Sequence, residues 1–221
     1  MNFKWLPNAL TIARCVFAVL CFWGVIQALQ AQGAIDLGMT QDIPADEQGR
    51  RAAIQQLWYQ FALLAFLSGA LTDFLDGWLA RRLDAHSRFG VWLDPIADKL
   101  LVGLALLGLA MIFRTWLVYI PAAAIIARDA FMTWLRTTPR GRAVVDPSNL
   151  AKWKTGFEMA AIIGLMLPLA VMPQDAVSQN GAQGVLAGFT AFLLVALLWI
   201  AAGLSVWTGW RYMKAAAQSA R

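Results

Sequence analysis

Residues 52–72 read AAIQQLWYQFALLAFLSGALT, twenty-one consecutive positions without a charged side chain. A helix needs about 20 predominantly apolar residues to cross the hydrocarbon core of a bilayer. A second such stretch, CVFAVLCFWGVIQALQAQGAI, occupies residues 15–35. Of the 221 residues, 60% are apolar and 14% are charged, whereas soluble domains contain about 25% charged residues. Lipid is therefore the expected solvent, and this composition excludes a disulfide-stapled secreted module and an ordinary cytosolic enzyme.

Residues 176–210 are also free of charge and are long enough for one helix with a loop before it. The other charge-free runs are shorter, and two of them reach spanning length only if charged residues lie inside the helix. In the third helix these are Asp94, Asp98 and Lys99, and in the fourth they are Arg128 and Asp129. Ionisable groups inside a membrane are costly, and they usually face a protein cavity with a function. The predicted fold is an all-α integral membrane protein in which residues 1–221 form one domain. The six predicted helices cover about 6–31, 54–81, 92–113, 116–137, 150–172 and 184–213.

Basic residues are distributed unevenly about these six helices. With the N-terminus in the cytoplasm, 15 of the 18 Lys and Arg residues lie on the cytoplasmic side, and the other three are Arg50, Arg51 and Arg114. The positive-inside rule then predicts that both termini are cytoplasmic. We expect a multi-pass protein of the cell (inner) membrane. The net charge of +5 reflects this orientation, so no nucleic-acid partner is expected.

Four aspartates lie near the cytoplasmic ends of the second and third predicted helices. Asp73 and Asp76 are three residues apart and Asp94 and Asp98 are four apart, so each pair shares a helical face. A short connection brings the two helices back antiparallel, with both pairs at one depth. Four carboxylates in a region of low dielectric constant cannot all stay charged without a counter-ion. Hard divalent ions prefer such ligands, and two ions are the usual arrangement for displacement at phosphorus.

Other residues of this segment also have chemical uses. Gly77 and Ala80 leave room for an extended group against the second helix, and Arg81 can bind a phosphate through two hydrogen bonds. Gly90 permits a close approach where the third helix begins. A set of interhelical salt bridges is one alternative, but only Arg81 and Lys99 are near the acids in the sequence. A cation channel and a structural scaffold are further alternatives, although neither uses the two small residues and the arginine.

The segment from Asp73 to Asp98 follows the pattern D-x2-D-G-x2-A-R-x8-G-x3-D-x3-D, and it resembles the motif of the CDP-alcohol phosphatidyltransferase family at every defined position. This resemblance implies an enzyme that moves the phosphatidyl group of CDP-diacylglycerol to an alcohol and releases CMP. It implies two ions of Mg²⁺ or Mn²⁺ as cofactors, with Asp98 also as catalytic base, and a homodimer. The implied metal ligands are Asp73, Asp76, Asp94 and Asp98. The implied CDP-diacylglycerol site comprises Asp73, Asp76, Gly77, Ala80, Arg81, Gly90, Asn8 and Thr11.

Four cations near the cytoplasmic ends of the fourth and fifth helices bear on the identity of the alcohol. They are Arg128, Arg136, Lys152 and Lys154. Arg128 and Arg136 are eight residues apart, about two helical turns, and therefore share a face. Cations beside an acidic metal site favour a pocket for a phosphate on the acceptor. Ordinary positive-inside anchoring is the alternative interpretation.

Four segments resemble the phosphatidylglycerophosphate synthase branch of this family. They are residues 7–14, 94–99, 128–136 and 151–159. The departures are Asp129 in place of Glu, Ala151 in place of Gly and Glu158 in place of Gln. The resemblance implies that sn-glycerol 3-phosphate is the acceptor and that the four cations bind its phosphate, while the acyl chains of CDP-diacylglycerol remain among the membrane lipids. The alternative is the same chemistry with phosphatidylglycerol, giving cardiolipin, or with inositol phosphate.

Overall fold

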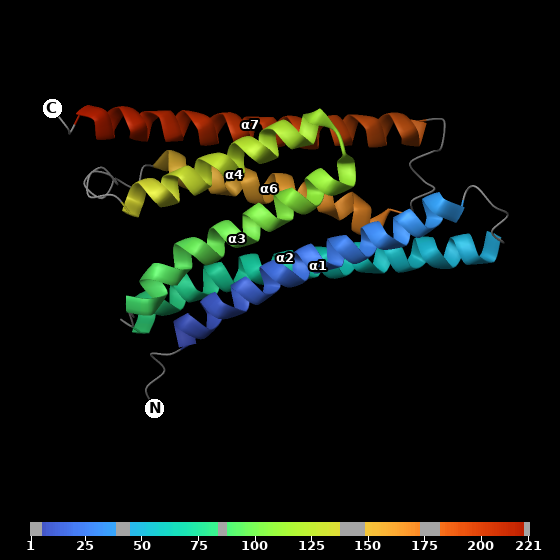
Figure 1. Ribbon diagram of the computed structural model, residues 1–221, viewed down its shortest axis with the longest axis horizontal. Helices are drawn as coiled ribbons and strands as arrows, with labels where there is room; N and C mark the ends of the chain where they lie inside the picture. Colours follow the sequence, from blue (N-terminus) through green and yellow to red (C-terminus); the bar gives the residue numbers. More distant parts are fainter. Residues whose placement is uncertain (1–5, 39–44, 84–87, 138–148, 173–181, 219–221) are drawn as a thin grey trace.

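The computed structural model describes residues 6–38, 45–83, 88–137, 149–172 and 182–218, and the regular elements in these ranges are all helices (Figure 1). Six of the described helices are long and apolar enough to cross a membrane, which confirms the predicted fold class of a multi-pass helical protein. Their bounds are α1 Leu6–Gly38, α2 Ala45–Leu83, α3 Arg88–Phe113, α4 Trp116–Thr137, α6 Asn149–Val171 and α7 Ala182–Gln218.

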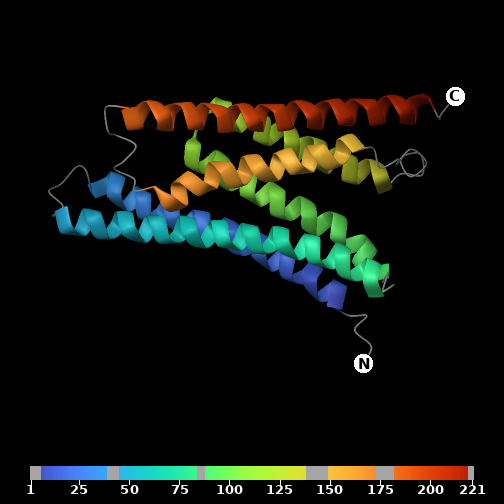
Figure 2. The ribbon, with the colours of Figure 1, turned by 180° about the vertical axis from the view of Figure 1, so that it is seen from behind.

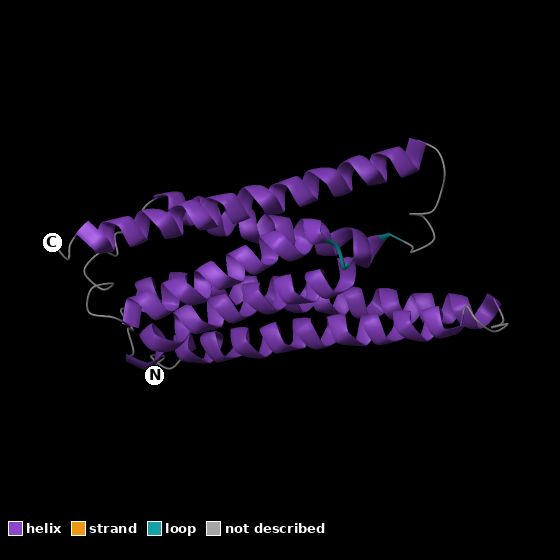
Figure 3. Cartoon of the chain, turned by 45° about the horizontal axis from the view of Figure 1, so that its top comes forward, coloured by secondary structure: helices purple, strands orange, loops and turns teal. Residues whose placement is uncertain are grey.

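The helix bounds differ from the predicted ones mainly at the first connection. The first helix continues to Gly38 and the second begins at Ala45, because charged residues that end an apolar run need not end a helix. Glu47 lies in the first turn of α2, where a negative charge is favourable. Its Oε1 forms an ion pair with Nη2 of Arg51 at 2.7 Å. The predicted boundary between α3 and α4 is confirmed, since Arg114 takes a left-handed φ of 47° and ends α3 (Figure 3).

Successive helices run in opposite directions along the bundle, as Figure 1 and the view from behind in Figure 2 show. One end of the bundle therefore collects the end of α2 and the start of α3. The starts of α1 and α6 and the ends of α4 and α7 lie at the same end. We call it the motif end. The prediction that this end faces the cytoplasm rests on the positive-inside rule.

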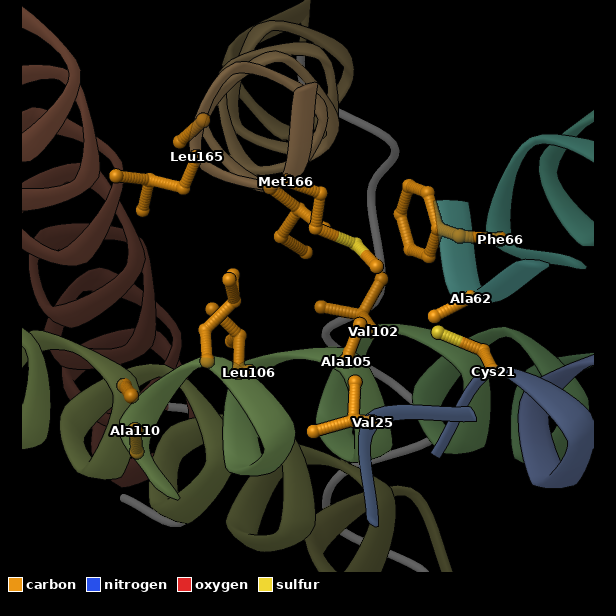
Figure 4. Packing of buried hydrophobic residues seen from close by; sticks show 14 of the residues in the cluster. Cys21, Val25, Ala62, Phe66, Val102, Ala105, Leu106, Ala110, Leu165 and Met166 are labelled. Atoms are coloured by element: carbon orange, nitrogen blue, oxygen red, sulfur yellow. The ribbon is translucent and has the colours of Figure 1, made fainter. Parts of the chain in front are cut away.

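Helix α3 lies at the centre of the bundle, in contact with α1, α2, α4 and α6. Its side chains Leu101, Leu106 and Leu109 are at most 1% exposed. Figure 4 shows buried side chains of α1, α2, α3 and α6 that pack together in this core: Cys21, Val25, Ala62, Phe66, Val102, Ala105, Leu106, Ala110, Leu165 and Met166. Burial of this apolar surface holds α3 in place. The charged residues Asp98 and Lys99, just before this core on α3, are partly exposed at the motif end.

Candidate active site

An arginine from α1 holds the two motif acids of α2. The side chain of Arg14 is 1% exposed, and its Nη1 lies 2.9 Å from Oδ1 of Asp73. Its Nη2 forms a second ion pair with Oδ2 of Asp76, which is buried. A planar guanidinium suits this role because its fork of donors can serve two carboxylates one turn apart. The charge of Arg14 is thus compensated inside the bundle, as burial of a cation requires.

One turn before Arg14, Thr11 holds a motif acid of α3. The buried Thr11 hydroxyl donates a hydrogen bond from Oγ1 to Oδ1 of Asp94 at 2.5 Å, while Asp94 itself is exposed. Residues three apart share a helical face, so a single face of α1 contacts three of the four motif acids. The fourth, Asp98, lies one turn further along α3, with an Oδ2 atom 3.5 Å from Nζ of Lys99. We call Asp73, Asp76, Asp94 and Asp98 the acidic cluster.

The donor set of the acidic cluster fits a hard divalent ion, because it consists of carboxylate oxygens from two adjacent helices at one end of the bundle. The side chain of Asp73 is 46% exposed, so its carboxylate is open to a ligand. Within the described ranges, no three His, Cys, Asp or Glu side chains are gathered about a point where one ion would lie. Three of the four acids instead have protein partners on α1.

A second cluster of charges surrounds Asp129 of α4, whose side chain is 7% exposed. Its Oδ2 lies 2.7 Å from Nζ of Lys99, and its Oδ1 lies 2.7 Å from Nζ of Lys154 and 2.8 Å from Nη1 of Arg128. Lys154 also contacts Oε1 of the buried Glu158 at 3.1 Å. We call these five residues the basic cluster. Three cations and two acids leave it a formal charge of +1.

Helix α7 positions the arginine of the basic cluster. Arg128 donates from Nη2 to Oγ1 of Thr208 at 3.0 Å, and the Thr208 hydroxyl donates to the carbonyl of Leu204 at 2.9 Å. A Cβ atom at position 209, which is a glycine, would lie 3.1 Å from Cγ of Arg128. Gly209 therefore leaves room for the stem of the arginine. Neither Thr208 nor Gly209 belongs to a motif, so nothing in the sequence analysis pointed to them.

Lys99 joins the two clusters. Its Nζ lies 3.5 Å from Oδ2 of Asp98 in the acidic cluster and 2.7 Å from Oδ2 of Asp129 in the basic cluster. Both clusters therefore belong to one continuous site at the motif end. Of the predicted acceptor residues, the structure brings together Arg128 and Lys154, each in contact with Asp129.

Several predicted site residues cannot be placed at the level of side chains. Their backbone lies in α2, α3, α4 and α6, but their surroundings lie outside the described part of the structure: Gly77, Ala80, Arg81, Gly90, Arg136 and Lys152. Asn8, predicted at the CDP-diacylglycerol site with Thr11, is half-buried on α1, one turn before Thr11.

The sequence analysis missed the role of Arg14, although a signal was present. Arg14 is the only charged residue between Lys4 and Asp36. A single cation within a predicted membrane helix is energetically unfavourable and therefore indicates a partner or a functional site. Arg14 precedes Asp73 by 59 residues (73 − 14), so proximity in the sequence does not reveal it as a counter-ion of the motif acids. Asp129 was identified as an ionisable residue inside the fourth predicted helix, but its contacts with Lys99 and Lys154 were not predicted, because these partners come from other helices.

Comparison with known proteins identifies a family and several relatives of this chain. The model of the CDP-alcohol phosphatidyltransferase family matches residues 4–207. The chain is 36% identical over 180 residues to the CDP-diacylglycerol–glycerol-3-phosphate 3-phosphatidyltransferase of Cereibacter sphaeroides, covering 71% of this chain and 81% of that protein. The protein of that name in Escherichia coli K12 is 35% identical over 164 residues, covering 72% and 80%. A cardiolipin synthase (CMP-forming) of Oryza sativa is 34% identical over 164 residues, covering 67% of this chain and 46% of that protein.

Proposed function

The chain belongs to the CDP-alcohol phosphatidyltransferase family, and we propose that it transfers the phosphatidyl group of CDP-diacylglycerol to sn-glycerol 3-phosphate. The products are phosphatidylglycerophosphate and CMP. The relatives from Cereibacter sphaeroides and Escherichia coli, which carry this activity in their names, support the choice of acceptor. We also propose that the enzyme is a homodimer in the cell (inner) membrane and that its site is open to the cytoplasm.

The observation that carries this proposal is the pair of oppositely charged clusters at one end of the bundle, joined by Lys99. A nucleotide diphosphate needs divalent ions, which four carboxylates suit. A free phosphate on the acceptor needs cations, and the basic cluster has one more cation than acids. A single site that binds both substrates therefore requires both kinds of cluster, side by side.

Asp73, Asp76, Asp94 and Asp98 are the residues that would hold divalent ions, two of Mg²⁺ or Mn²⁺. Such ions, when bound, neutralise the charge of the diphosphate and of the leaving CMP. Carboxylate ligands are oxygen donors of the hardness that these ions prefer. The described orientation, in which Arg14 and Thr11 contact three of these acids, is compatible with binding through oxygens that α1 does not contact or after a change of side-chain rotamer.

We assign the proton transfer to Asp98. Its carboxylate accepts the proton of the sn-1 hydroxyl of sn-glycerol 3-phosphate, and the resulting oxygen forms a bond to the phosphorus that carries diacylglycerol. The bond from this phosphorus to the CMP oxygen breaks on the opposite side. Alignment of the two substrates accounts for most of the rate in reactions of this kind. The 3.5 Å contact of Asp98 with Lys99, which also contacts Asp129, supports this assignment because it brings the carboxylate next to the basic cluster.

The remaining residues of the motif and the cation set bind the substrates. Gly77, Ala80, Arg81 and Gly90, with Asn8 and Thr11, are proposed to line the cytidine diphosphate site. Arg128 and Lys154, with Arg136 and Lys152, are proposed to bind the acceptor phosphate. The acyl chains of CDP-diacylglycerol remain in the surrounding lipid, so that only the headgroup enters the site.

A second candidate keeps the reaction and changes the acceptor to phosphatidylglycerol, which would yield cardiolipin. The similarity to the cardiolipin synthase of Oryza sativa favours this alternative, but the buried cations of the basic cluster favour an acceptor with a free phosphate. Inositol phosphate also carries such a phosphate and is therefore a third acceptor to test.

The test is CMP release by the purified protein from CDP-diacylglycerol with Mg²⁺ or Mn²⁺. Glycerol 3-phosphate, phosphatidylglycerol, inositol phosphate and serine are each supplied as the acceptor. We expect release with glycerol 3-phosphate, none after chelation of the ions, and a lipid product that contains two phosphates. CMP release only with phosphatidylglycerol would show that this lipid is the acceptor. Ion flux through liposomes without CMP release would show that the protein is a channel and not an enzyme.

A further inference from the structure

We propose that α1 competes with divalent ions for the acidic cluster, because Thr11 and Arg14 hold three of its four acids in protein contacts. The inference rests on the proposed function in one respect, namely that these acids bind ions. It assigns to Thr11 and Arg14 of α1, which lie outside the D-x2-D…D-x3-D motif, the role of competitors for the ion ligands. The consequence is that free ions bind weakly to the enzyme until the lipid nucleotide is present.

Arg14 occupies the position of a counter-ion between the two acids of α2. One guanidinium nitrogen contacts Asp73 at 2.9 Å and another contacts Asp76, and the side chain is 1% exposed. Its Nε is buried and has no hydrogen-bond partner, so its polar contacts to these acids run through the terminal nitrogens. A divalent ion that approaches the same carboxylates is repelled by this fixed positive charge.

Thr11 acts on the other side of the cluster. Its hydroxyl hydrogen bond occupies Oδ1 of Asp94 at 2.5 Å, and an ion that takes this oxygen has to replace that bond. The Asp94 side chain is exposed, so the carboxylate is free to reorient toward an ion once the bond is lost. Because Asp94 is exposed, water can replace this bond, and we expect its loss to change ion affinity by the amount typical of an ordinary hydrogen bond, about threefold to tenfold.

The charges of the site explain why binding of ions and of the lipid nucleotide should be coupled. Arg14, the acidic cluster and the basic cluster together contain four cations and six acids, which leaves a formal charge of −2 (4 − 6). Two divalent ions would reverse this sign, and the two negative charges of a diphosphate would restore neutrality. Ions alone therefore leave an excess of positive charge in a region of low dielectric constant, which is unfavourable.

The experiment measures Mn²⁺ affinity by electron paramagnetic resonance on the full-length protein, without acceptor, in the absence and presence of CDP-diacylglycerol. Thr11→Val removes the hydroxyl at nearly constant shape, and Thr11→Ser is its matched control. Without CDP-diacylglycerol, we expect Thr11→Val to bind Mn²⁺ about threefold to tenfold more tightly than wild type, and Thr11→Ser to match wild type. With CDP-diacylglycerol, the difference should become smaller.

Arg14→Lys tests the second contact. It keeps the charge but replaces the fork by a single ammonium, which cannot serve both acids in the same way, so Mn²⁺ should again bind more tightly than to wild type. Equal or weaker Mn²⁺ binding by Thr11→Val overturns the inference, because α1 would then be neutral toward the ions or would organise their ligands. If the wild type does not bind Mn²⁺ even with CDP-diacylglycerol, the ion site of the proposed function is refuted instead. If Arg14→Lys does not fold, the Thr11 pair decides alone.

Discussion

The acidic and basic clusters differ in how much of their charge is compensated by ion pairs within the protein. In the acidic cluster, one buried cation, Arg14, serves two of four acids, and the side chain of Asp73 is still 46% exposed. In the basic cluster, Asp129 contacts three cations, and the side chains of Asp129, Lys154 and Glu158 are at most 7% exposed. The first arrangement leaves charge available to a ligand, whereas most charge in the second is compensated within the protein.

This difference predicts two kinds of response to mutation. Removal of an exposed acid costs little folding free energy because water can solvate its former partner. Removal of one member of a buried ion pair leaves an uncompensated charge in the interior, which is strongly destabilising. Substitutions in the acidic cluster should therefore affect chemistry first, and substitutions in the basic cluster should affect stability as well as acceptor binding.

The largest expected effect is that of Asp98→Asn in the acidic cluster. The amide retains the size of the carboxylate but cannot accept the acceptor's proton, so CMP release should fall by about 10²- to 10⁴-fold. The unfolding temperature in detergent should stay close to that of the wild type. Turnover like that of the wild type would refute the assignment of Asp98 as the base.

Asp129→Asn should give the largest loss of stability, about 3 kcal/mol, since the cations of Lys99, Arg128 and Lys154 lose their common partner. The matched control is Asp73→Asn, for which we expect a loss below about 1 kcal/mol because that side chain is half exposed and Arg14 keeps Asp76. Thermal unfolding of both variants measures the contrast. Equal losses would show that the two clusters do not differ in the way described.

Thr208→Val should weaken acceptor binding without a change in the chemical step. The variant removes the oxygen that accepts the 3.0 Å hydrogen bond of Arg128, so that the guanidinium is less well oriented. We expect the KM for glycerol 3-phosphate to rise about tenfold and kcat to stay within about twofold. Thr208→Ser keeps the hydroxyl and should behave like the wild type. A fall in kcat at unchanged KM would place Arg128 in the reaction itself.

Glu158→Gln should have the smallest effect on acceptor binding, in the opposite direction, and should cost less stability than Asp129→Asn because Lys154 keeps Asp129 as a partner. It removes an acid 3.1 Å from Lys154 and raises the formal charge of the basic cluster from +1 to +2. The KM for glycerol 3-phosphate should fall about threefold at low salt, with less change at high salt. An unchanged KM would mean that Lys154 does not contribute to acceptor binding, and the cation pocket would then have to rely on other residues.

The sequence allowed much of the site to be predicted because its motif is local. Asp73 and Asp76 lie on one helix and Asp94 and Asp98 on the next, so helical periodicity and a short connection were enough to bring them to one end of the bundle. Contacts across distant helices were out of reach. Arg14 meets Asp76 across 62 residues, and Arg128 meets Thr208 across 80.

The number, type and approximate bounds of the membrane helices were determined by sequence alone, because the bilayer demands long apolar segments whatever their neighbours. Tertiary structure alone decided which charges compensate which, since a buried ion pair depends on how helices pack side by side. For that reason the contacts of Arg14 and Thr11 with the motif acids, and the three cations about Asp129, form only when α1, α2, α3, α4 and α6 are assembled around one core.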